Sequence, residues 1–161
     1  MMIKMVVFDV DGTLTDGKIY VGTQGEIMKA FNVKDGLGIT KLHIKGIVPV
    51  FITGRNSEII TNRAKELNIT EVHQGIHDKV KKLKQISGKY ECDFDEIAYI
   101  GDDENDLECM KLCGIKGCPA DAVNDVKKVV NFVSKRNGGD GAVREFIEYL
   151  LCISSENNTT L

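Results

Sequence analysis

The sequence predicts an α/β fold, with a doubly wound parallel sheet, helices on both faces, right-handed crossovers and one protruding β-hairpin. Three short apolar runs rich in Val and Ile predict the sheet, because parallel strands are buried on both faces. These runs cover residues 3–8, 47–52 and 97–100, and each stops abruptly at polar or acidic residues. Segments with helical periodicity lie between and after the runs and supply the crossovers.

The remaining elements are weaker in pattern. Further strands are expected near residues 71–73, 115–118 and 129–133. Helical spacing behind a cap at Ser57 predicts a helix that begins near Asn56, with Ile60, Ala64 and Leu67 on its buried side. The same spacing from Val143 to Leu151 predicts the last helix. We therefore expect a folded core over residues 1–153 and a mobile polar tail over residues 154–161.

A hairpin interrupts the alternation of strands and helices. Residues 18–21 and 26–31 are the predicted strands, and residues 22–25 form a four-residue loop with two glycines. Both hairpin faces are partly apolar, so an uncovered hairpin would aggregate. The hairpin either folds back on its own domain or packs on copies of itself in an oligomer.

Composition excludes several classes of protein. The chain has 161 residues, of which 42% are hydrophobic and 28% charged, and its net charge is −3. It lacks the basic excess that binds nucleic acid or anionic membranes, and no apolar run approaches the ~20 residues of a membrane span. The five cysteines form no Cys-x-x-Cys pair, and the first apolar run has no signal-peptide cleavage region. We expect a cytoplasmic protein with reduced thiols.

The chemistry lies where the strands end. Asp9 and Asp11 follow the first run two positions apart, so their side chains point to one side. The second run is followed by Thr53, Gly54 and Arg55, and the third run by Asp102, Asp103 and Asp106. The basic residue Lys79 follows a loop that contains a glycine. Ligands of an open parallel sheet bind beyond the carboxyl ends of its strands, so we expect these groups to meet there.

The residue types at this edge predict phosphoryl transfer. Converging carboxylates repel unless a cation lies between them, and oxygen ligands without cysteine favour Mg²⁺. The Thr53 hydroxyl, the Gly54 amide and the Lys79 ammonium are suitable donors to phosphate oxygens. One Asp would attack phosphorus, and a second acid would protonate the leaving alcohol.

These motifs resemble the four signatures of the haloacid dehalogenase-like phosphatases, in order. They are Asp9-Val10-Asp11-Gly12-Thr13, Thr53-Gly54, Lys79 and Gly101-Asp102-Asp103-x-x-Asp106. The resemblance implies that Asp9 is the nucleophile and Asp11 the general acid and then the base. It also implies Mg²⁺ held by the Asp9 carboxylate, the Asp11 backbone carbonyl and Asp102, with support from Asp103 and Asp106. Thr53 and Lys79 would hold the phosphoryl oxygens.

A narrower resemblance concerns the substrate. The chain has no room for a cap domain after its first or second motif, and several further segments are similar to the capless 3-deoxy-D-manno-octulosonate 8-phosphate phosphatases. They are residues 31–39, 53–57, 63–64, 74–79 and 138–145. The resemblance implies a homotetramer in which hairpins build a central barrel and a neighbour covers the active site. It also implies a role in the biosynthesis of bacterial lipopolysaccharide.

Four further residues are candidates for substrate binding. Arg55 and Arg63 are eight positions apart and would share one side of a helix that begins near Asn56, where two guanidinium groups can bind a carboxylate. Asn32 and Asp35 belong to the segment of resemblance, although Asp35 could instead cap a helix. The chain is also similar to 9-phosphate phosphatases of nine-carbon sialic-type acids, which typically carry Glu at the position of Arg55.

Two other classes remain as alternatives. A signalling receiver domain also combines an aspartyl-phosphate, Mg²⁺, Thr and Lys, but its acidic pair is separate from its phosphorylated Asp. An inactive phosphatase-like assembly module is the second, and the acids at positions 9, 11 and 102 argue against it. The glycine-rich run at residues 138–141 could cradle phosphate, but we expect a flexible loop there.

Overall fold

The computed structural model describes residues 2–158, and side chains of residues 2–154. Its main sheet has six parallel strands in the order β5-β4-β1-β6-β7-β8. These are β1 (Met5–Phe8), β4 (Val48–Ile52), β5 (Glu71–His73), β6 (Ile97–Ile100), β7 (Ile115–Cys118) and β8 (Phe132–Val133). The prediction of a parallel α/β sheet is confirmed.

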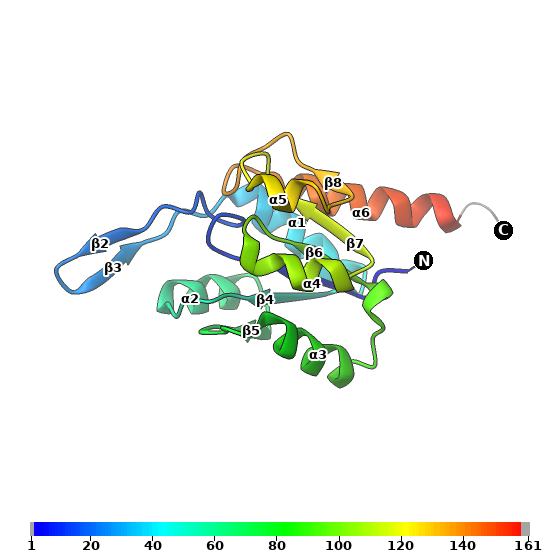
Figure 1. The fold of residues 1–161 in the computed structure, drawn as a ribbon, viewed down its shortest axis with the longest axis horizontal. Helices are drawn as coiled ribbons and strands as arrows, with labels where there is room; N and C mark the ends of the chain where they lie inside the picture. The colour runs from blue at the N-terminus through cyan, green and yellow to red at the C-terminus, as the bar shows by residue number, and fades with distance from the viewer. Residues whose placement is uncertain (1, 159–161) are drawn as a thin grey trace.

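Helices cover both faces of this sheet (Figure 1). They are α1 (Val33–Ile44), α2 (Glu58–Glu66), α3 (Lys79–Lys89), α4 (Leu107–Leu112), α5 (Asn124–Lys127) and α6 (Ala142–Asn158), with short 3-10 turns η1 (Phe94–Glu96) and η2 (Glu104–Asp106). Among the described residues, no helix is both long enough and apolar enough to cross a bilayer.

The sheet separates two apolar cores, and alternate strand residues enter each of them. Val6 and Phe8 of β1 pack with α1, α2 and α6, whereas Met5 and Val7 pack with α3, α4 and α5. This double burial explains why the strands are continuous apolar runs rather than alternating ones. The order of strands reverses on the two sides of β1, so its carboxyl end lies at the point where binding crevices form.

Two predicted boundaries are wrong. The strand expected at residues 129–133 is confined to Phe132–Val133, because Val129 and Val130 follow the end of α5 and pack into the core beside it. The expected tail begins inside a helix, since α6 continues to Asn158. Residues 154–158 contain no Gly or Pro to stop it, and the Ser154 hydroxyl donates to the Leu150 carbonyl within the helix. Residues 159–161 lie outside the described residues.

The hairpin projects from the body of the molecule as β2 (Tyr20–Gly22) and β3 (Gly25–Met28) (Figure 1). Its loop is shorter than predicted, because Gly22 and Gly25 pair across the strands and leave two residues in the turn. Gly25 has a φ of +111°, which favours glycine. Ile19, Val21, Ile27 and Met28 are all exposed in the single chain, so the hairpin does not bury its apolar side chains against its own domain.

The glycine-rich run before α6 is packed rather than flexible. A Cβ at Gly138 would lie 1.9 Å from the Gly12 carbonyl oxygen, so only glycine fits against the loop after β1. The Gly139 N–H donates to the Thr13 carbonyl at 3.1 Å, which ties the two loops together. The run therefore supports the loop that follows β1.

Candidate active site

Strand register brings the predicted carboxylates and Thr53 to one edge of the sheet. Phe8 of β1 pairs with Phe51 of β4 and Ile100 of β6, and the next residues of the chain leave the sheet together. Asp9 lies between the two neighbours, and its N–H donates to the Ile100 carbonyl at 3.0 Å. Thr53 follows β4, and Asp102 follows β6. The strand ends therefore place Asp9, Asp102 and Thr53 at the carboxyl edge of the sheet.

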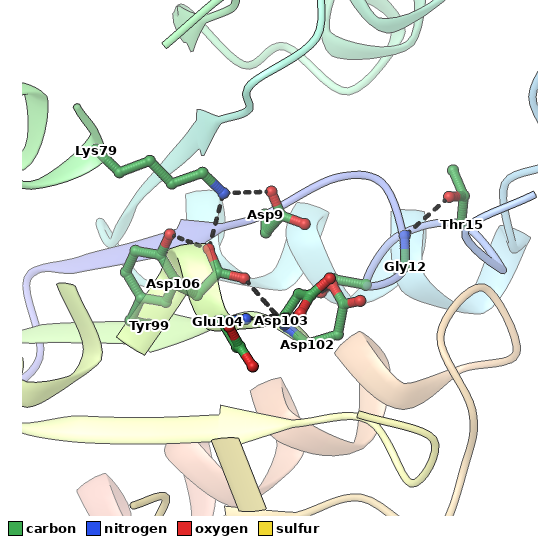
Figure 2. Close-up of polar contacts among 10 residues, drawn as sticks. Asp9, Gly12, Thr15, Lys79, Tyr99, Asp102, Asp103, Glu104 and Asp106 are labelled. Carbon is green, nitrogen blue, oxygen red and sulfur yellow. Dashed lines mark hydrogen bonds and ion pairs between the residues drawn. The ribbon is translucent and has the colours of Figure 1, made fainter. Parts of the chain in front are cut away.

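Lys79 is a buried cation at this edge (Figure 2). It is the first residue of α3, whose start is fixed by Asp78, and its Nζ lies 2.6 Å from Asp9 Oδ1 and 2.8 Å from Asp106 Oδ1. Burial opposes the Lys79 charge, but the two carboxylates outweigh it, so the pKa of Lys79 is raised. The side chain therefore stays an ammonium ion.

Asp106 has its oxygens occupied by protein donors. Besides Lys79, the Tyr99 hydroxyl donates to Oδ1 at 2.7 Å, and the Asp102 backbone N–H donates to Oδ2 at 3.2 Å (Figure 2). The side chain is fully buried at the start of α4. Through these contacts Asp106 holds Lys79 and the turn that carries Asp102 in position. The motif implies such a supporting role for this residue.

The Asp102 carboxylate packs against Gly12, where only glycine fits. A Cβ at Gly12 would lie 2.1 Å from Asp102 Oδ2, and Gly12 has a φ of +93°. The Thr13 hydroxyl donates to Asp102 Oδ1 at 2.9 Å and holds the carboxylate in place. Burial is the main reason that the pKa of Asp102 rises to about 6. The charge of Asp106 raises it further, against the hydrogen bond from Thr13.

The carboxylates fit a hard divalent cation. One oxygen each of Asp9, Asp102 and Asp106 lies within 4.8 Å of the others. Because Asp106 is already bonded to several donors, Asp9 and Asp102 are the side chains that retain ligand capacity. Burial raises the pKa of Asp9 well above its usual range, and the charge of Asp106 adds to the rise although Lys79 opposes it. Additional positive charge would stabilise both groups as carboxylates.

Asp11 is held by the hairpin. The Lys29 ammonium contacts Asp11 Oδ1 and lies 2.8 Å from Glu26 Oε1, and only 1% of the Lys29 side chain is exposed. Burial lowers the pKa of Lys29, but the hydrogen bonds to Asp11 and Glu26 outweigh this and raise it. The base of the hairpin thus belongs to the same cluster of charges as the acid predicted to serve the leaving group.

Arg55 lies in a loop and not on a helix, so the argument from helical spacing with Arg63 is wrong. Helix α2 begins at Glu58 with Ser57 as its N-cap. The Ser57 hydroxyl donates to Glu26 instead of accepting from the helix. The Arg55 side chain is 46% exposed at the rim, and its guanidinium is 3.9 Å from Glu26. It remains accessible to a ligand.

Two other predicted substrate residues, Arg63 and Asn32, have partners within the chain. Arg63 lies over the Phe31 ring at 5.4 Å, donates to the Asn32 carbonyl and pairs with Glu66. The Asn32 side chain accepts from the Lys34 N–H and caps α1.

Asp35 caps a helix, as the alternative interpretation held, but the helix is α6. Its Oδ1 accepts from the Arg144 N–H at 2.8 Å, and 1% of the residue is exposed. Burial raises the pKa of Asp35 to about 6. The structure does not bring Asp35 to the edge where Asp9 and Asp102 meet.

Four residues of the site escaped the sequence prediction. Tyr99 lies inside an apolar run, and Thr13 belongs to the first motif without a predicted role of its own. Lys29 and Glu26 lie in a hairpin segment whose pattern is set by its apolar positions. The available signal was charge, because Lys29 and Glu26 are three positions apart beside apolar residues and can form a pair.

Known proteins share this architecture. A family model described as haloacid dehalogenase-like hydrolase matches residues 69–147. The 3-deoxy-D-manno-octulosonate 8-phosphate phosphatase KdsC of Yersinia pestis is 40% identical over 149 residues, which cover 92% of this chain and 80% of that protein.

Solved structures agree with the sequence relationship. The phosphatase of the same description from Moraxella catarrhalis, in complex with magnesium ion, phosphate ion and KDO, is 39% identical, with a TM-score of 0.89 over 92% of this chain and 86% of that one. The cobalt-bound Haemophilus influenzae phosphatase is 38% identical, with a TM-score of 0.90 over 92% and 87%. The chain belongs to the haloacid dehalogenase-like hydrolases, in the family of the 3-deoxy-D-manno-octulosonate 8-phosphate phosphatases.

Proposed function

We propose that this protein is a Mg²⁺-dependent phosphatase that hydrolyses 3-deoxy-D-manno-octulosonate 8-phosphate to the free sugar acid and phosphate. The observation that carries the proposal is the meeting of Asp9, Asp102 and Lys79 at one edge of the sheet, in a chain of this family. Relatives that are about 40% identical to this chain are named for that substrate, and one of them was solved in complex with magnesium, phosphate and the sugar acid.

The metal would be held by the Asp9 carboxylate, the Asp11 backbone carbonyl and Asp102. Asp103 and Asp106 would support this set, as the contacts of Asp106 with Lys79 and the Asp102 N–H suggest. When bound, Mg²⁺ neutralises charge on the phosphoryl oxygens and keeps the carboxylates ionised.

Asp9 is the proposed nucleophile. Its carboxylate oxygen forms a bond to phosphorus while the bond from phosphorus to the sugar oxygen breaks, which leaves an aspartyl-phosphate. Asp11 gives a proton to the departing sugar oxygen and then takes one from the water that releases phosphate. Thr53 and Lys79 hold the phosphoryl oxygens, and Lys79 is already placed 2.6 Å from the nucleophile.

Substrate selection is assigned to the rim. Gly54 offers its backbone N–H, and the exposed guanidinium of Arg55 suits the carboxylate of a sugar acid. Arg63 and Asn32 contribute indirectly in this proposal, since Arg63 packs on Phe31 and the Asn32 side chain caps α1. Their contacts shape the segment that leads from the hairpin into α1.

A panel of substrates tests the assignment. With Mg²⁺ present, we expect kcat/KM to be at least about tenfold higher for the eight-carbon sugar acid 8-phosphate than for nine-carbon sialic-type 9-phosphates, since one rim contact contributes on the order of 1–3 kcal/mol. Chelation of the metal should abolish turnover of both, and added Mg²⁺ should restore it. A preference for the nine-carbon ester would establish the alternative substrate and leave the chemistry unchanged.

The hairpin is the proposed contact of a homotetramer. Ile19, Val21, Ile27 and Met28 are exposed in the single chain, and an apolar two-stranded ribbon is stable in water only when covered. A neighbouring copy could also close the open site, which lacks a cap domain.

If the hairpin forms the tetramer contact, a charge among its exposed apolar side chains should lower the mass of the assembly. Val21→Asp places a charge among the exposed apolar side chains, and we expect it to reduce a tetramer to smaller species in sedimentation experiments and to lower turnover. Gln24→Asp adds the same charge in the turn of the hairpin and should leave the mass unchanged. An unchanged mass for Val21→Asp, or a wild-type monomer, would contradict the proposal.

The proposed compartment is the cytoplasm, where the sugar acid would serve lipopolysaccharide biosynthesis. The cysteines support this compartment because the five thiols are free and four are buried.

A further inference from the structure

Lys29 is a buried cation that the proposed chemistry does not yet use. It follows β3 directly, and its ammonium lies between Asp11 and Glu26 with 1% of the side chain exposed. A buried ammonium requires opposing charge, and these two carboxylates supply it. Lys79 cannot serve Asp11 in the same way, because it is engaged with Asp9 and Asp106.

The contact with Lys29 makes the two oxygens of Asp11 unequal. Oδ1 accepts from the Lys29 ammonium. Oδ2 is buried and has no hydrogen-bond partner among the described residues. Asp11 lies in a turn after β1, where an aspartate side chain would otherwise sample several rotamers. The ion pair fixes the rotamer and leaves Oδ2 as the oxygen that no protein donor occupies.

Lys29 is itself held within a single chain. Glu26, its second partner, accepts a hydrogen bond from the Ser57 hydroxyl at the start of α2, and Arg55 is 3.9 Å from the same carboxylate. Strand β3 of the hairpin is therefore attached to the loop after β4 independently of any neighbour. Any effect of Lys29 on Asp11 operates inside one subunit.

We propose that Lys29 is a positioning residue for departure of the sugar alcohol: it holds Asp11 so that Oδ2 meets the bridging oxygen of the ester. The inference rests on the proposed function. When the bond between phosphorus and that oxygen breaks, its electron pair stays on the oxygen, which takes the Asp11 proton and leaves as the alcohol. The phosphoryl group is then bonded to Asp9. Lys29 touches neither the substrate nor the phosphorus atom.

The leaving group distinguishes this role from a structural one. A sugar alkoxide is strongly basic and must be protonated as it leaves, so its departure depends on a well-placed acid. A p-nitrophenolate is weakly basic and departs without that proton. Both esters use the same nucleophile, cation and phosphoryl contacts. A misplaced Asp11 therefore slows formation of the aspartyl-phosphate from the alkyl ester and has little effect on its formation from the aryl ester. The later attack of water on the aspartyl-phosphate is common to both esters, so the two are compared by kcat/KM, which reports the steps up to release of the alcohol.

The test compares both esters on each preparation of enzyme, with Mg²⁺ present. Lys29→Met keeps a side chain of similar length and removes the charge, and we expect kcat/KM for the sugar acid phosphate to fall about 10- to 100-fold. For p-nitrophenyl phosphate we expect a fall of less than about threefold. Lys29→Arg retains a cation and should restore most of the loss. Lys18→Met, at an exposed hairpin lysine paired with Asp16, is the matched control and should match the wild type.

Two results would overturn the inference: an equal loss for both esters, or no loss for either. The ratio of the two rates is independent of the active fraction, so partial unfolding or dissociation of Lys29→Met does not imitate the expected result. The proposed function is judged separately, by wild-type turnover of the octulosonate ester. If that ester is not hydrolysed but ribose 5-phosphate is, the ratio is measured with ribose 5-phosphate. If the wild type hydrolyses no alkyl ester, both proposals are wrong.

Discussion

Asp9→Asn is expected to lower kcat for phosphate release by at least about 10⁴-fold, because the amide cannot attack phosphorus and no other described carboxylate occupies its position. The fold should persist, since the substitution keeps the size of the side chain at a residue that is 6% exposed beside Lys79. The measurement is steady-state release of inorganic phosphate at saturating substrate and Mg²⁺, with circular dichroism as the check on folding.

Asp125→Asn is the matched control for this substitution. Asp125 is an exposed carboxylate of α5 that pairs with Lys128, and its loss should leave turnover unchanged. Trapping the phosphorylated protein by rapid acid quench adds a second readout, because label should appear on the wild type and not on Asp9→Asn. Turnover of Asp9→Asn near the wild-type rate would exclude the aspartyl-phosphate mechanism.

Lys79→Met is expected to reduce both stability and activity. The substitution leaves Asp9 and Asp106 as buried carboxylates without their shared cation, and breaking such a pair costs about 3–5 kcal/mol. We expect the free energy of unfolding in metal-free buffer to fall by about that amount. The loss of one charged donor to the phosphoryl group should lower kcat by about 10²- to 10³-fold.

A double substitution separates the two effects of Lys79. Adding Asp106→Asn to Lys79→Met removes one of the stranded charges, and its side-chain carbonyl can still accept from the Asp102 N–H. Urea unfolding should show recovery of part of the stability, whereas kcat should stay low because the cation is still missing. Lys111→Met, at a surface pair with Glu108, controls for loss of an ordinary ion pair. Full stability of Lys79→Met would contradict the assigned role of the buried pair.

The sheet and the acids could be predicted from sequence because both follow from short local rules. Continuous apolar runs marked strands buried on both faces, and the ends of those runs marked the edge where Asp9 and Asp102 meet. The weak strand at residues 71–73 was also located correctly. What decided these elements was the composition of a few neighbouring residues.

The remaining errors concern contacts between distant segments. The sequence leaves Asp35 as either a substrate residue or a helix cap, because nothing near it in the chain shows that α6 begins against it, over a hundred positions later. Arg55 and Arg63 are predicted to share a helix side because the helix is expected to begin near Asn56, whereas α2 begins at Glu58 and the Ser57 hydroxyl donates to Glu26 of the hairpin. Lys29 was missed for the same reason. The role proposed for Lys29 depends on the turn that carries Asp11, which lies in a different segment of the sequence.

The light packing of Arg55 affects how this enzyme can evolve. Its side chain is nearly half exposed and makes a single long contact with Glu26, so exchanging it removes little of the interior that keeps the chain folded. The catalytic acids and the apolar cores can stay unchanged while substitutions at the rim adapt the site to another acidic sugar. In such a scaffold, new specificities arise by replacing residues one at a time, without rebuilding the domain.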